Sequence, residues 1–275
     1  MKDFAGRHVV ITGGSSGIGL ACAELFARHG ADVTLIARSI ARLEAACEAV
    51  STQRRDGTQN VRWVSADVST ADEAARAVRE ASVDGSAPID ILVNGAGTIL
   101  PGYFESMPIE YFEECMDSWR ACVHMCRAAV PDMIERGSGH IVNVSSMGGF
   151  MTFFGYTAYS SAKYAIMGFS EALRSEMKPH GITVTVVCPP DTETPGLAFE
   201  KSLRPPETDK VSGNLAAVSP DVIAHALLRA VERRRYLVVP GLVPKLYRVL
   251  KSNAHWLFFA IVDSDVKTAR KARGV

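Results

Sequence analysis

The sequence predicts an α/β protein, with one doubly wound domain built on a parallel sheet of seven strands. Short apolar segments rich in β-branched residues alternate with longer segments of helical periodicity along most of the 275 residues. A glycine-rich turn follows directly after the first apolar segment. Hydrophobic residues make up 47% of the chain and charged residues 22%, which is typical of globular proteins and excludes disordered or collagen-like classes.

The expected strands are short and almost continuously apolar, which is typical of parallel strands covered by helices on both faces. They span residues 8–12, 33–37, 61–65, 89–93, 140–144, 182–187 and 236–239. The expected helices lie between them, at residues 17–28, 41–50, 71–82, 109–136, 157–178 and 220–233. Right-handed crossovers between such units produce a doubly wound, Rossmann-like sheet.

One segment interrupts the alternation of strands and helices. Residues 189–219 contain Pro190, Pro195, Pro205 and Pro206, and we expect an irregular loop there. A loop of this length inside a compact domain usually serves a function. We therefore expect it to form a lid over a site, within a single domain that spans residues 1–241.

Residues 242–275 are expected to form an amphipathic extension of that domain. Apolar residues alternate with basic ones in the first part of this segment, and residues 256–262 are all apolar. The segment ends in a basic tail that includes Arg273. The pattern fits a helix that lies on a membrane surface. It fits equally well a helix packed on the domain or on a second subunit.

Composition indicates where in the cell the protein is found and which kinds of partner it has. Thirty Lys and Arg residues balance thirty Asp and Glu, so the formal net charge is zero and we expect no nucleic-acid partner. The first residues lack the apolar segment of a secretory signal, and no run of about 18 apolar residues predicts a membrane span. The six cysteines show no paired close spacing that is typical of a disulfide framework. We expect free thiols, no metal site, and a location in the cytoplasm or on the cytoplasmic face of a membrane.

The turn between the first expected strand and helix predicts a dinucleotide phosphate site. Residues 12–19 have the sequence TGGSSGIG. Glycines allow the backbone to turn tightly and approach a phosphate, and the helix that follows offers free N–H groups to it. A plain glycine turn is the alternative. The candidate contacts are Gly13, Ser15, Ser16, Gly17, Ile18 and Gly19.

The end of the second strand favours NADP over NAD. An NAD site usually carries an acidic residue here for the ribose hydroxyls, but this chain has Arg38. A guanidinium group matches the 2′-phosphate of NADP with a planar set of donors. The alternative is that Arg38 is only a solvated side chain at the start of a helix. NADPH or NADP is the expected cofactor.

Further candidate contacts with the cofactor follow other strands, because ligands of doubly wound sheets bind at the carboxyl ends of the strands. Asp67 is expected to hydrogen-bond the adenine amino group, to cap the next helix, or to do both. The remaining candidates are Val68, Asn94, Ala96, Gly97, Pro189, Thr192 and Thr194.

The segment after the fifth strand carries the candidate catalytic residues. Tyr159 and Lys163 lie four residues apart, which places them on one face of a helix. A free tyrosine has a pKa of about 10, and a neighbouring ammonium group is expected to lower it toward the working range. Ser146 ends the preceding strand, where its hydroxyl can orient a carbonyl toward Tyr159. We also place Tyr159 and Lys163 among the cofactor contacts.

These motifs in this order resemble the short-chain dehydrogenase/reductase family over nearly the whole chain. The matching residues are Gly13, Gly17, Gly19, Asn94, Ala96, Gly97, Ser146, Tyr159 and Lys163. Gly95 stands where the family usually has a second Asn. The resemblance implies an oxidoreductase that uses NADPH to reduce a ketone. It also implies a homodimer or homotetramer that packs through the helices at residues 109–136 and 157–178.

A narrower resemblance concerns the substrate. The segment Pro-Pro-Asp-Thr-Glu-Thr-Pro-Gly at residues 189–196 is similar to that of 3-ketodihydrosphingosine reductases. This implies reduction of a long-chain ketone to dihydrosphingosine in sphingolipid synthesis. The alternatives are another ketone, such as a 3-oxoacyl thioester or a steroid, and an NADP-binding sensor with weak catalysis. The aromatic and apolar side chains of residues 150–154 and 197–199 are expected to line the substrate pocket or to pack an interface.

The long helix at residues 109–136 departs from the family pattern. The family usually has an Asn there that holds a water molecule for proton relay. Counting from the two ends of the helix places either Ser118 or Trp119 at that position. Ser118 can hold a water molecule and is our candidate catalytic residue, whereas Trp119 cannot. We expect slower proton relay than in relatives that have the Asn.

Overall fold

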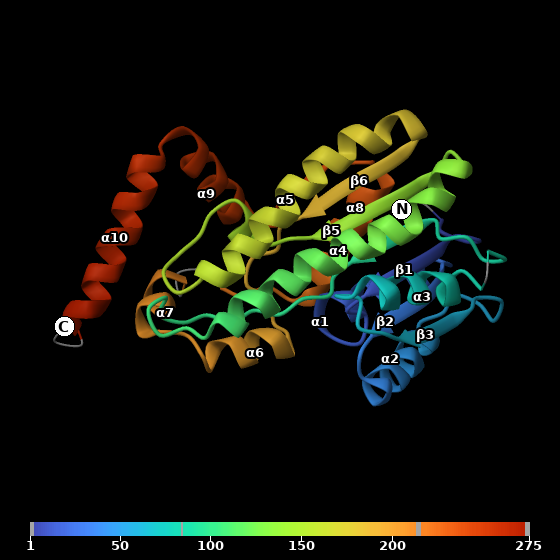
Figure 1. Cartoon of the computed structure of the whole chain (residues 1–275), viewed down its shortest axis with the longest axis horizontal. Helices are drawn as coiled ribbons and strands as arrows, with labels where there is room; N and C mark the ends of the chain where they lie inside the picture. The colour runs from blue at the N-terminus through green and yellow to red at the C-terminus, as the bar shows by residue number, and fades with distance from the viewer. Residues whose placement is uncertain (1–2, 84, 213–215, 273–275) are drawn as a thin grey trace.

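The structure is a computed structural model that describes residues 3–83, 85–212 and 216–272 (Figure 1). Seven parallel strands form one sheet in the order β3-β2-β1-β4-β5-β6-β7. This confirms the predicted fold class and number of strands. The strands are β1 (His8–Thr12), β2 (Asp32–Ala37), β3 (Val61–Ser65), β4 (Ile91–Asn94), β5 (Gly139–Val144), β6 (Ile182–Val187) and β7 (Leu237–Val238).

Helices cover both faces of the sheet because successive strand residues point to opposite sides. On β1, Val9 and Ile11 pack with α1, α2 and α8, whereas Val10 packs on the other face with α3, α4 and α5. All three side chains are fully buried. These helices are α1 (Gly17–Arg28), α2 (Ile40–Thr52), α3 (Ala71–Ala81), α4 (Ile109–Glu135), α5 (Thr157–Met177) and α8 (Pro220–Glu232).

The expectation that residues 189–219 form an irregular loop is wrong for the part that the structure describes. Two short helices lie there, α6 (Pro195–Lys201) and α7 (Pro206–Ser212). Each begins with a proline, whose fixed φ suits the first helical position. Thr194 caps α6 by accepting a hydrogen bond from the backbone N–H of Leu197 at 3.1 Å. The prolines therefore begin helices in this segment. Residues 213–215 lie outside the described part.

The C-terminal extension forms two helices, α9 (Leu242–Asn253) and α10 (His255–Ala272). They stand at one end of the molecule, and α10 packs against α7 (Figure 1). Among the described residues, no helix is both long enough and apolar enough to cross a membrane. Arg273, part of the expected basic tail, lies outside the described residues. The domain boundary at residue 241 stays a prediction.

The six cysteines are free thiols, and all except Cys47 are buried. Burial raises the pKa of Cys22, Cys122 and Cys188 to about 12, so these thiols are protonated packing groups. Within the described ranges, no three His, Cys, Asp or Glu side chains are grouped closely enough to hold a metal ion.

Candidate active site

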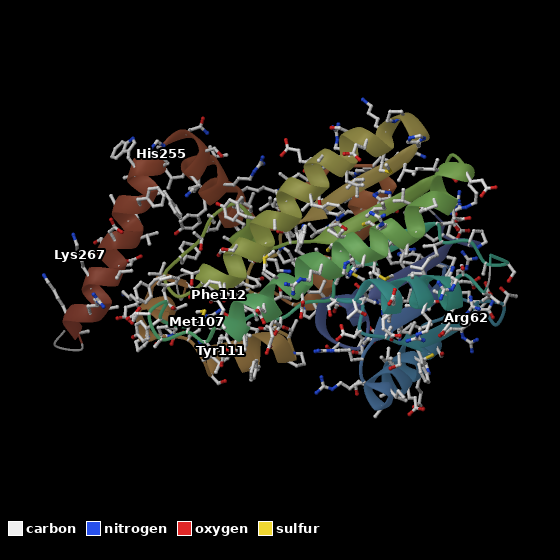
Figure 2. The ribbon with its side chains drawn as sticks, in the orientation of Figure 1. Arg62, Met107, Tyr111, Phe112, His255 and Lys267 are labelled. Carbon is white, nitrogen blue, oxygen red and sulfur yellow. The ribbon has the colours of Figure 1, made fainter. Side chains whose placement is uncertain are left out.

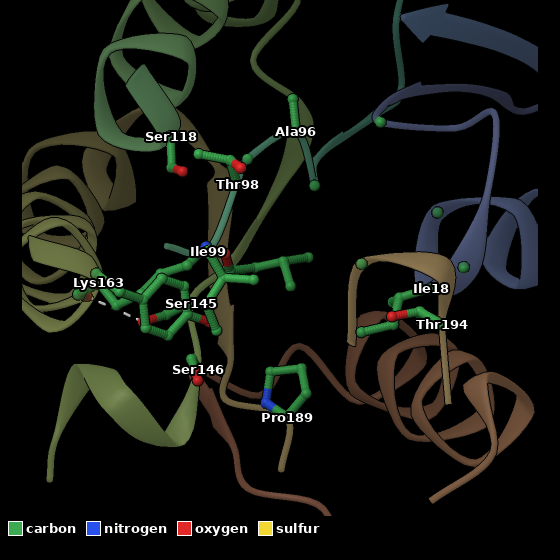
Figure 3. Close-up of a pocket in the computed structure, with 18 of the residues that line it drawn as sticks. Ile18, Ala96, Thr98, Ile99, Ser118, Ser145, Ser146, Lys163, Pro189 and Thr194 are labelled. Atoms are coloured by element: carbon green, nitrogen blue, oxygen red, sulfur yellow. Dashed lines mark hydrogen bonds between the residues drawn. The ribbon is translucent and has the colours of Figure 1, made fainter. Parts of the chain in front are cut away.

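A cavity of about 770 Å³ lies at the carboxyl ends of the central strands (Figure 3). It brings together every predicted site residue except Asn94. Lys163 lines it from α5 near Ser145 and Ser146, and Ser118 lines it from α4, while Ile18 and Thr194 lie on the opposite side (Figure 3). The clustering follows from the topology, since parallel strands all end at the same edge of the sheet.

The glycine turn is packed too tightly for side chains at its key positions. A Cβ atom on Gly19 would lie 2.3 Å from the Gly13 carbonyl oxygen, and one on Gly13 would lie 2.9 Å from the Gly95 backbone. Gly13 and Gly17 also have φ values of 69° and 54°, in the left-handed region that favours glycine. Ser16 precedes α1 and makes no capping hydrogen bond within the described chain. The first N–H groups of α1 are therefore available to an anion in the cavity.

Two arginines line the end of the cavity near β2. Arg38 is the predicted one, and Arg42 was missed. Arg42 lies in the first turn of α2, and Ser39 caps this helix by accepting a hydrogen bond from the Arg42 N–H at 3.5 Å. Arg38 precedes the cap and is outside the helix, so helical spacing gave no signal that the two arginines share a direction.

Asp67 lines the cavity and also stabilises the turn before α3. Its Oδ1 accepts hydrogen bonds from the Ser69 hydroxyl at 2.7 Å and the Ser69 N–H at 3.1 Å. The hydrogen bond from the Ser69 hydroxyl is the main reason that the pKa of Asp67 lies below its usual value. The residue at the helix cap is Thr70, so the expectation that Asp67 caps the helix itself is wrong.

Asn94 is the one predicted contact that the structure places outside the cavity. Its side chain is buried, and its Nδ2 donates to Asn143 Oδ1 at 2.9 Å. Asn143 in turn donates to Ser170 Oγ on α5 at 2.8 Å. Asn94 therefore ties β4 and β5 to the helix that carries Tyr159 and Lys163, because its strand position points the side chain into the core. Asn94 is therefore not part of the cavity wall, and its contact with the cofactor stays a prediction.

Thr12, which was also missed, holds the ends of β1 and β4 together. Its hydroxyl oxygen accepts hydrogen bonds from the Gly95 N–H at 3.1 Å and the Ala96 N–H at 3.2 Å. A Cβ atom on Gly95 would lie 3.0 Å from the Thr12 carbonyl oxygen. Gly95, at the position where the family usually has Asn, thus suits a close approach of two backbone segments.

Ser146, Tyr159 and Lys163 lie together at the centre of the cavity. Ser146 Oγ accepts a hydrogen bond from the Gly148 N–H at 3.1 Å and also hydrogen-bonds Tyr159. Lys163 Nζ lies 5.6 Å from the centre of the Tyr159 ring and donates to the Val144 carbonyl at 3.3 Å. The Lys163 backbone carbonyl accepts from Ser145 Oγ at 3.0 Å, which fixes α5 against the end of β5.

Burial has the largest effect on the pKa values of Tyr159 and Lys163. It raises the pKa of the Tyr159 phenol above its ordinary value, although the hydrogen bond from Ser146 lowers it. Burial also lowers the pKa of Lys163. The expectation that the pKa of Tyr159 is brought down toward the working range is therefore wrong for this structure, because burial disfavours the charged phenolate.

Ser118 occupies the position that the sequence left open between Ser118 and Trp119. It is 1% exposed and lines the cavity, and its Oγ has no hydrogen-bond partner among the described residues. A Cβ atom on Gly97 would lie 2.5 Å from that oxygen and 3.6 Å from Lys163 Nζ. Trp119 is not part of the cavity wall. The Ser118 hydroxyl thus faces the space beside Lys163, where a buried oxygen needs a polar partner.

A charge network around the buried Arg204 side chain joins α6 to the segment that follows β6. Arg204, whose side chain is 3% exposed, donates to Asp191 Oδ2 at 2.7 Å and to Glu200 Oε1 at 2.6 Å. The Tyr156 hydroxyl also donates to Glu200. Asp191, Glu200 and Tyr156 line the cavity. Sequence reasoning missed this network because its members come from three separate segments.

The predicted apolar lining is confirmed in part. Met151, Phe153 and Leu197 line the cavity, together with Met147. The remaining members of the predicted set, Phe150, Phe154, Ala198 and Phe199, lie outside its wall. Phe154 packs against Tyr103 with ring centres 5.8 Å apart, and Phe199 is 54% exposed.

Comparison with known proteins gives the class. Residues 7–203 match the family model for short chain dehydrogenases. The chain therefore belongs to the short-chain dehydrogenase/reductase family, and it is an oxidoreductase of the kind that uses a nicotinamide cofactor.

Its curated relatives include 3-ketodihydrosphingosine reductases. The one from Mus musculus is 41% identical over 225 residues, which are 82% of this chain and 68% of the relative. The 3-dehydrosphinganine reductase of Danio rerio is 40% identical over the same shares of the two chains. The 3-ketodihydrosphingosine reductase of Dictyostelium discoideum is 34% identical over 272 residues, which are 94% of this chain and 81% of the relative.

Solved structures of the same fold include oxidoreductases with bound cofactor. Levodione reductase is similar with a TM-score of 0.78 and 27% identity, over 86% of this chain and 96% of that one. L-sorbose reductase from Gluconobacter frateurii, complexed with NADPH and L-sorbose, has a TM-score of 0.74 and 29% identity, over 87% and 97% of the two chains. A short-chain dehydrogenase from Sphingobium yanoikuyae in complex with NADPH has a TM-score of 0.76 and 29% identity, over 92% and 95%.

Proposed function

We propose that this protein uses NADPH to reduce 3-ketodihydrosphingosine to dihydrosphingosine, a step of sphingolipid synthesis. The observation that carries the proposal is the meeting of Ser146, Tyr159 and Lys163 in the same cavity as an uncapped helix N-terminus and Arg38. The names of the curated relatives support this choice of ketone.

The cavity residues fit NADPH. The glycine turn and the free N–H groups of α1 suit the pyrophosphate, and Arg38 with Arg42 suits the 2′-phosphate. We assign Asp67 and Val68 to the adenine end, Lys163 to the nicotinamide ribose, and the neighbouring wall to its other contacts: Ala96, Gly97, Pro189, Thr192 and Thr194. When bound, NADPH supplies the hydride that the ketone carbon receives.

The chain's own residues supply the position and the proton. Ser146 and Tyr159 donate hydrogen bonds to the ketone oxygen, which orients the carbonyl. The raised pKa of Tyr159 keeps the phenol protonated, so it can give its proton to that oxygen as the alcohol forms. The buried Lys163 ammonium group then stabilises the phenolate. The Ser118 hydroxyl holds a water molecule beside Lys163 for the return of a proton.

We call the part of the cavity around Tyr159, Asp191 and Glu200 the substrate end. The charges there favour a ketone that carries a neighbouring cation. Asp191 and Glu200 line this end and pair with Arg204, and both acidic groups raise the pKa of Tyr159. Their field therefore reaches the phenol that meets the ketone. A 2-amino-3-ketone places its ammonium group within this field. A 3-oxoacyl thioester or a steroid ketone has no such group.

The decisive assay is NADPH oxidation by the purified protein with 3-ketodihydrosphingosine in detergent, with NADH in parallel. We expect rapid oxidation of NADPH and slow oxidation of NADH. Tyr159→Phe should lose nearly all turnover and still bind NADPH, because the phenol supplies the proton and little of the cofactor affinity. A Tyr159→Phe variant with wild-type turnover would refute the proposed chemistry. NADPH binding without turnover of any ketone would favour the sensor function instead.

We extend the proposal to partners and location. The protein forms a homodimer or homotetramer that packs through α4 and α5. It works in the cytoplasm, where residues 242–275 bring it to the cytoplasmic face of a membrane. Light scattering of the purified chain and fractionation of cells with and without residues 242–275 test these two points.

A further inference from the structure

The outer face of the α9–α10 hairpin concentrates the exposed apolar surface of the molecule. Eight of the fifteen large apolar side chains that are exposed in the described chain lie on these two helices. Leu242 is 83% exposed, Leu246 68% and Trp256 67%. The other five are Val243, Val249, Leu257, Phe259 and Ile261. Apolar patches of this kind mark a surface that meets a partner or a membrane.

The apolar part of this hairpin, residues 242–262, carries charge of one sign, and Asp263 and Asp265 follow it on α10, ahead of Lys267, Arg270 and Lys271. Residues 242–262 contain Lys245, Arg248 and Lys251 and no acidic residue, although the whole chain has a formal net charge of zero. Lys251 Nζ lies 4.3 Å from the centre of the Phe259 ring and 5.1 Å from that of Phe258. Lys251 therefore lies directly beside the exposed ring of Phe259, as cations do in helices that rest in the interface of anionic membranes.

The inner face of the hairpin forms a support for the substrate end of the cavity. Phe258 is 1% exposed, and its ring centre lies 6.0 Å from that of Phe153, which lines the cavity. Met147 and Met151 belong to the same apolar cluster. Arg270 Nε lies 3.5 Å from Glu207 on α7, which ties α10 to the lid. The hairpin is thus held firmly against the site while its other face stays exposed.

We propose that the outer face of α9–α10 is a docking surface for an anionic lipid bilayer, and that docking places the lid and the substrate end of the cavity at the membrane. Contact between two copies of this face would bring like charges together, whereas anionic headgroups neutralise them. In Figure 2, His255 and Lys267 mark this hairpin at the end of the molecule away from the sheet. Only the delivery of substrate rests on the proposed function.

The first experiment measures binding without substrate. The full chain is sedimented with vesicles of phosphatidylcholine alone and of phosphatidylcholine with phosphatidylglycerol. We expect binding to the anionic vesicles to be at least tenfold stronger. Replacing Lys245, Arg248 and Lys251 with Gln should weaken it on the order of 100-fold, since each basic residue near the surface adds about a fivefold gain. Matched controls change three exposed cations elsewhere: Arg79→Gln, Lys178→Gln and Arg229→Gln.

The apolar contribution is tested separately. A triple variant with Leu246→Ser, Trp256→Ser and Phe259→Ser should lose binding, whereas Phe104→Ser, at a side chain that is 68% exposed elsewhere, should not. Equal binding of wild-type protein to both kinds of vesicle, or none to either, would overturn the proposal. The proposal would also be overturned if the wild type were a dimer and the triple variant a monomer, because a second copy of the chain would then cover this face.

Activity separates this inference from the proposed function. We expect the triple variant to reduce a short-chain, water-soluble amino ketone at the wild-type rate and to lose activity on a long-chain ketone presented in anionic vesicles. Equal rates for wild type and variant on the vesicle-borne ketone would overturn delivery at the membrane. Vesicle binding by a protein that reduces neither ketone would leave the docking surface standing and refute the proposed function.

Discussion

Lowering the pH should weaken the fold through one buried side chain, His140 on β5. Its Nε2 lies 2.8 Å from Thr185 Oγ1, and that hydroxyl donates its only proton to the Arg235 carbonyl at 2.7 Å. Thr185 therefore accepts from His140, so Nε2 carries the proton of the neutral ring. Burial, with a smaller contribution from the charge of Arg234, lowers the pKa of His140 to about 4.

The sign of the effect follows from proton uptake by the unfolded chain. An unfolded histidine has a pKa of about 6.5, so between pH 6.5 and 4 it binds a proton that the folded protein excludes. The stabilising contribution is complete above pH 6.5 and is lost as the pH falls toward 4. The gap between the two pKa values is worth about 3 kcal/mol, of which about 2 kcal/mol is lost between pH 7 and 5.

Urea unfolding of wild type and His140→Gln at the two pH values measures this loss. Glutamine keeps an N–H donor for Thr185 and cannot take up a proton. The wild type should lose about 2 kcal/mol more of its free energy of unfolding between pH 7 and 5 than the variant does. The same pH dependence in both proteins would show that His140 does not exclude the proton and would refute the reasoning.

Three further predictions concern the site and its support. Arg42→Ala should raise the KM for NADPH about fivefold and leave the KM for NADH almost unchanged, because one exposed charge-assisted contact with the 2′-phosphate is lost. Equal effects on the two KM values would contradict this. Asp191→Asn should raise the KM for an amino ketone and leave that for its deaminated analogue unchanged, and a parallel rise would argue against charge recognition. Phe258→Ala should cost about 3–5 kcal/mol of unfolding free energy, whereas Phe259→Ala, at a neighbour that is 46% exposed, should cost under about 1 kcal/mol; calorimetry of both variants compares them.

The sequence was a good guide wherever chemistry follows local pattern. Alternating apolar segments predicted every strand of the sheet, and the glycine turn begins α1 at Gly17 as expected. The four-residue spacing of Tyr159 and Lys163 predicted their common helix face. Residues at strand ends were predicted to meet because parallel strands share one edge, and the cavity confirms this for all of them except Asn94.

Features that depend on long-range packing could not be predicted in this way. Arg204 pairs with Asp191 and Glu200 only because α6 folds against the segment that follows β6. The pKa of Tyr159 is raised by burial among several segments, although Lys163 lies nearby. Spacing along the chain carries no information about either effect.

The sequence by itself determined the doubly wound fold, the glycine turn and the pairing of Tyr159 with Lys163. Each depends on a period of two or about four residues, or on a short turn, that neighbouring residues specify. Only the tertiary structure decided that Asn94 points into the core, that Ser118 faces the cavity in place of Trp119, and that the C-terminal helices bury one face and expose the other. The physical reason is that a side chain's direction and burial depend on segments far away in the sequence, which come together only when the chain packs.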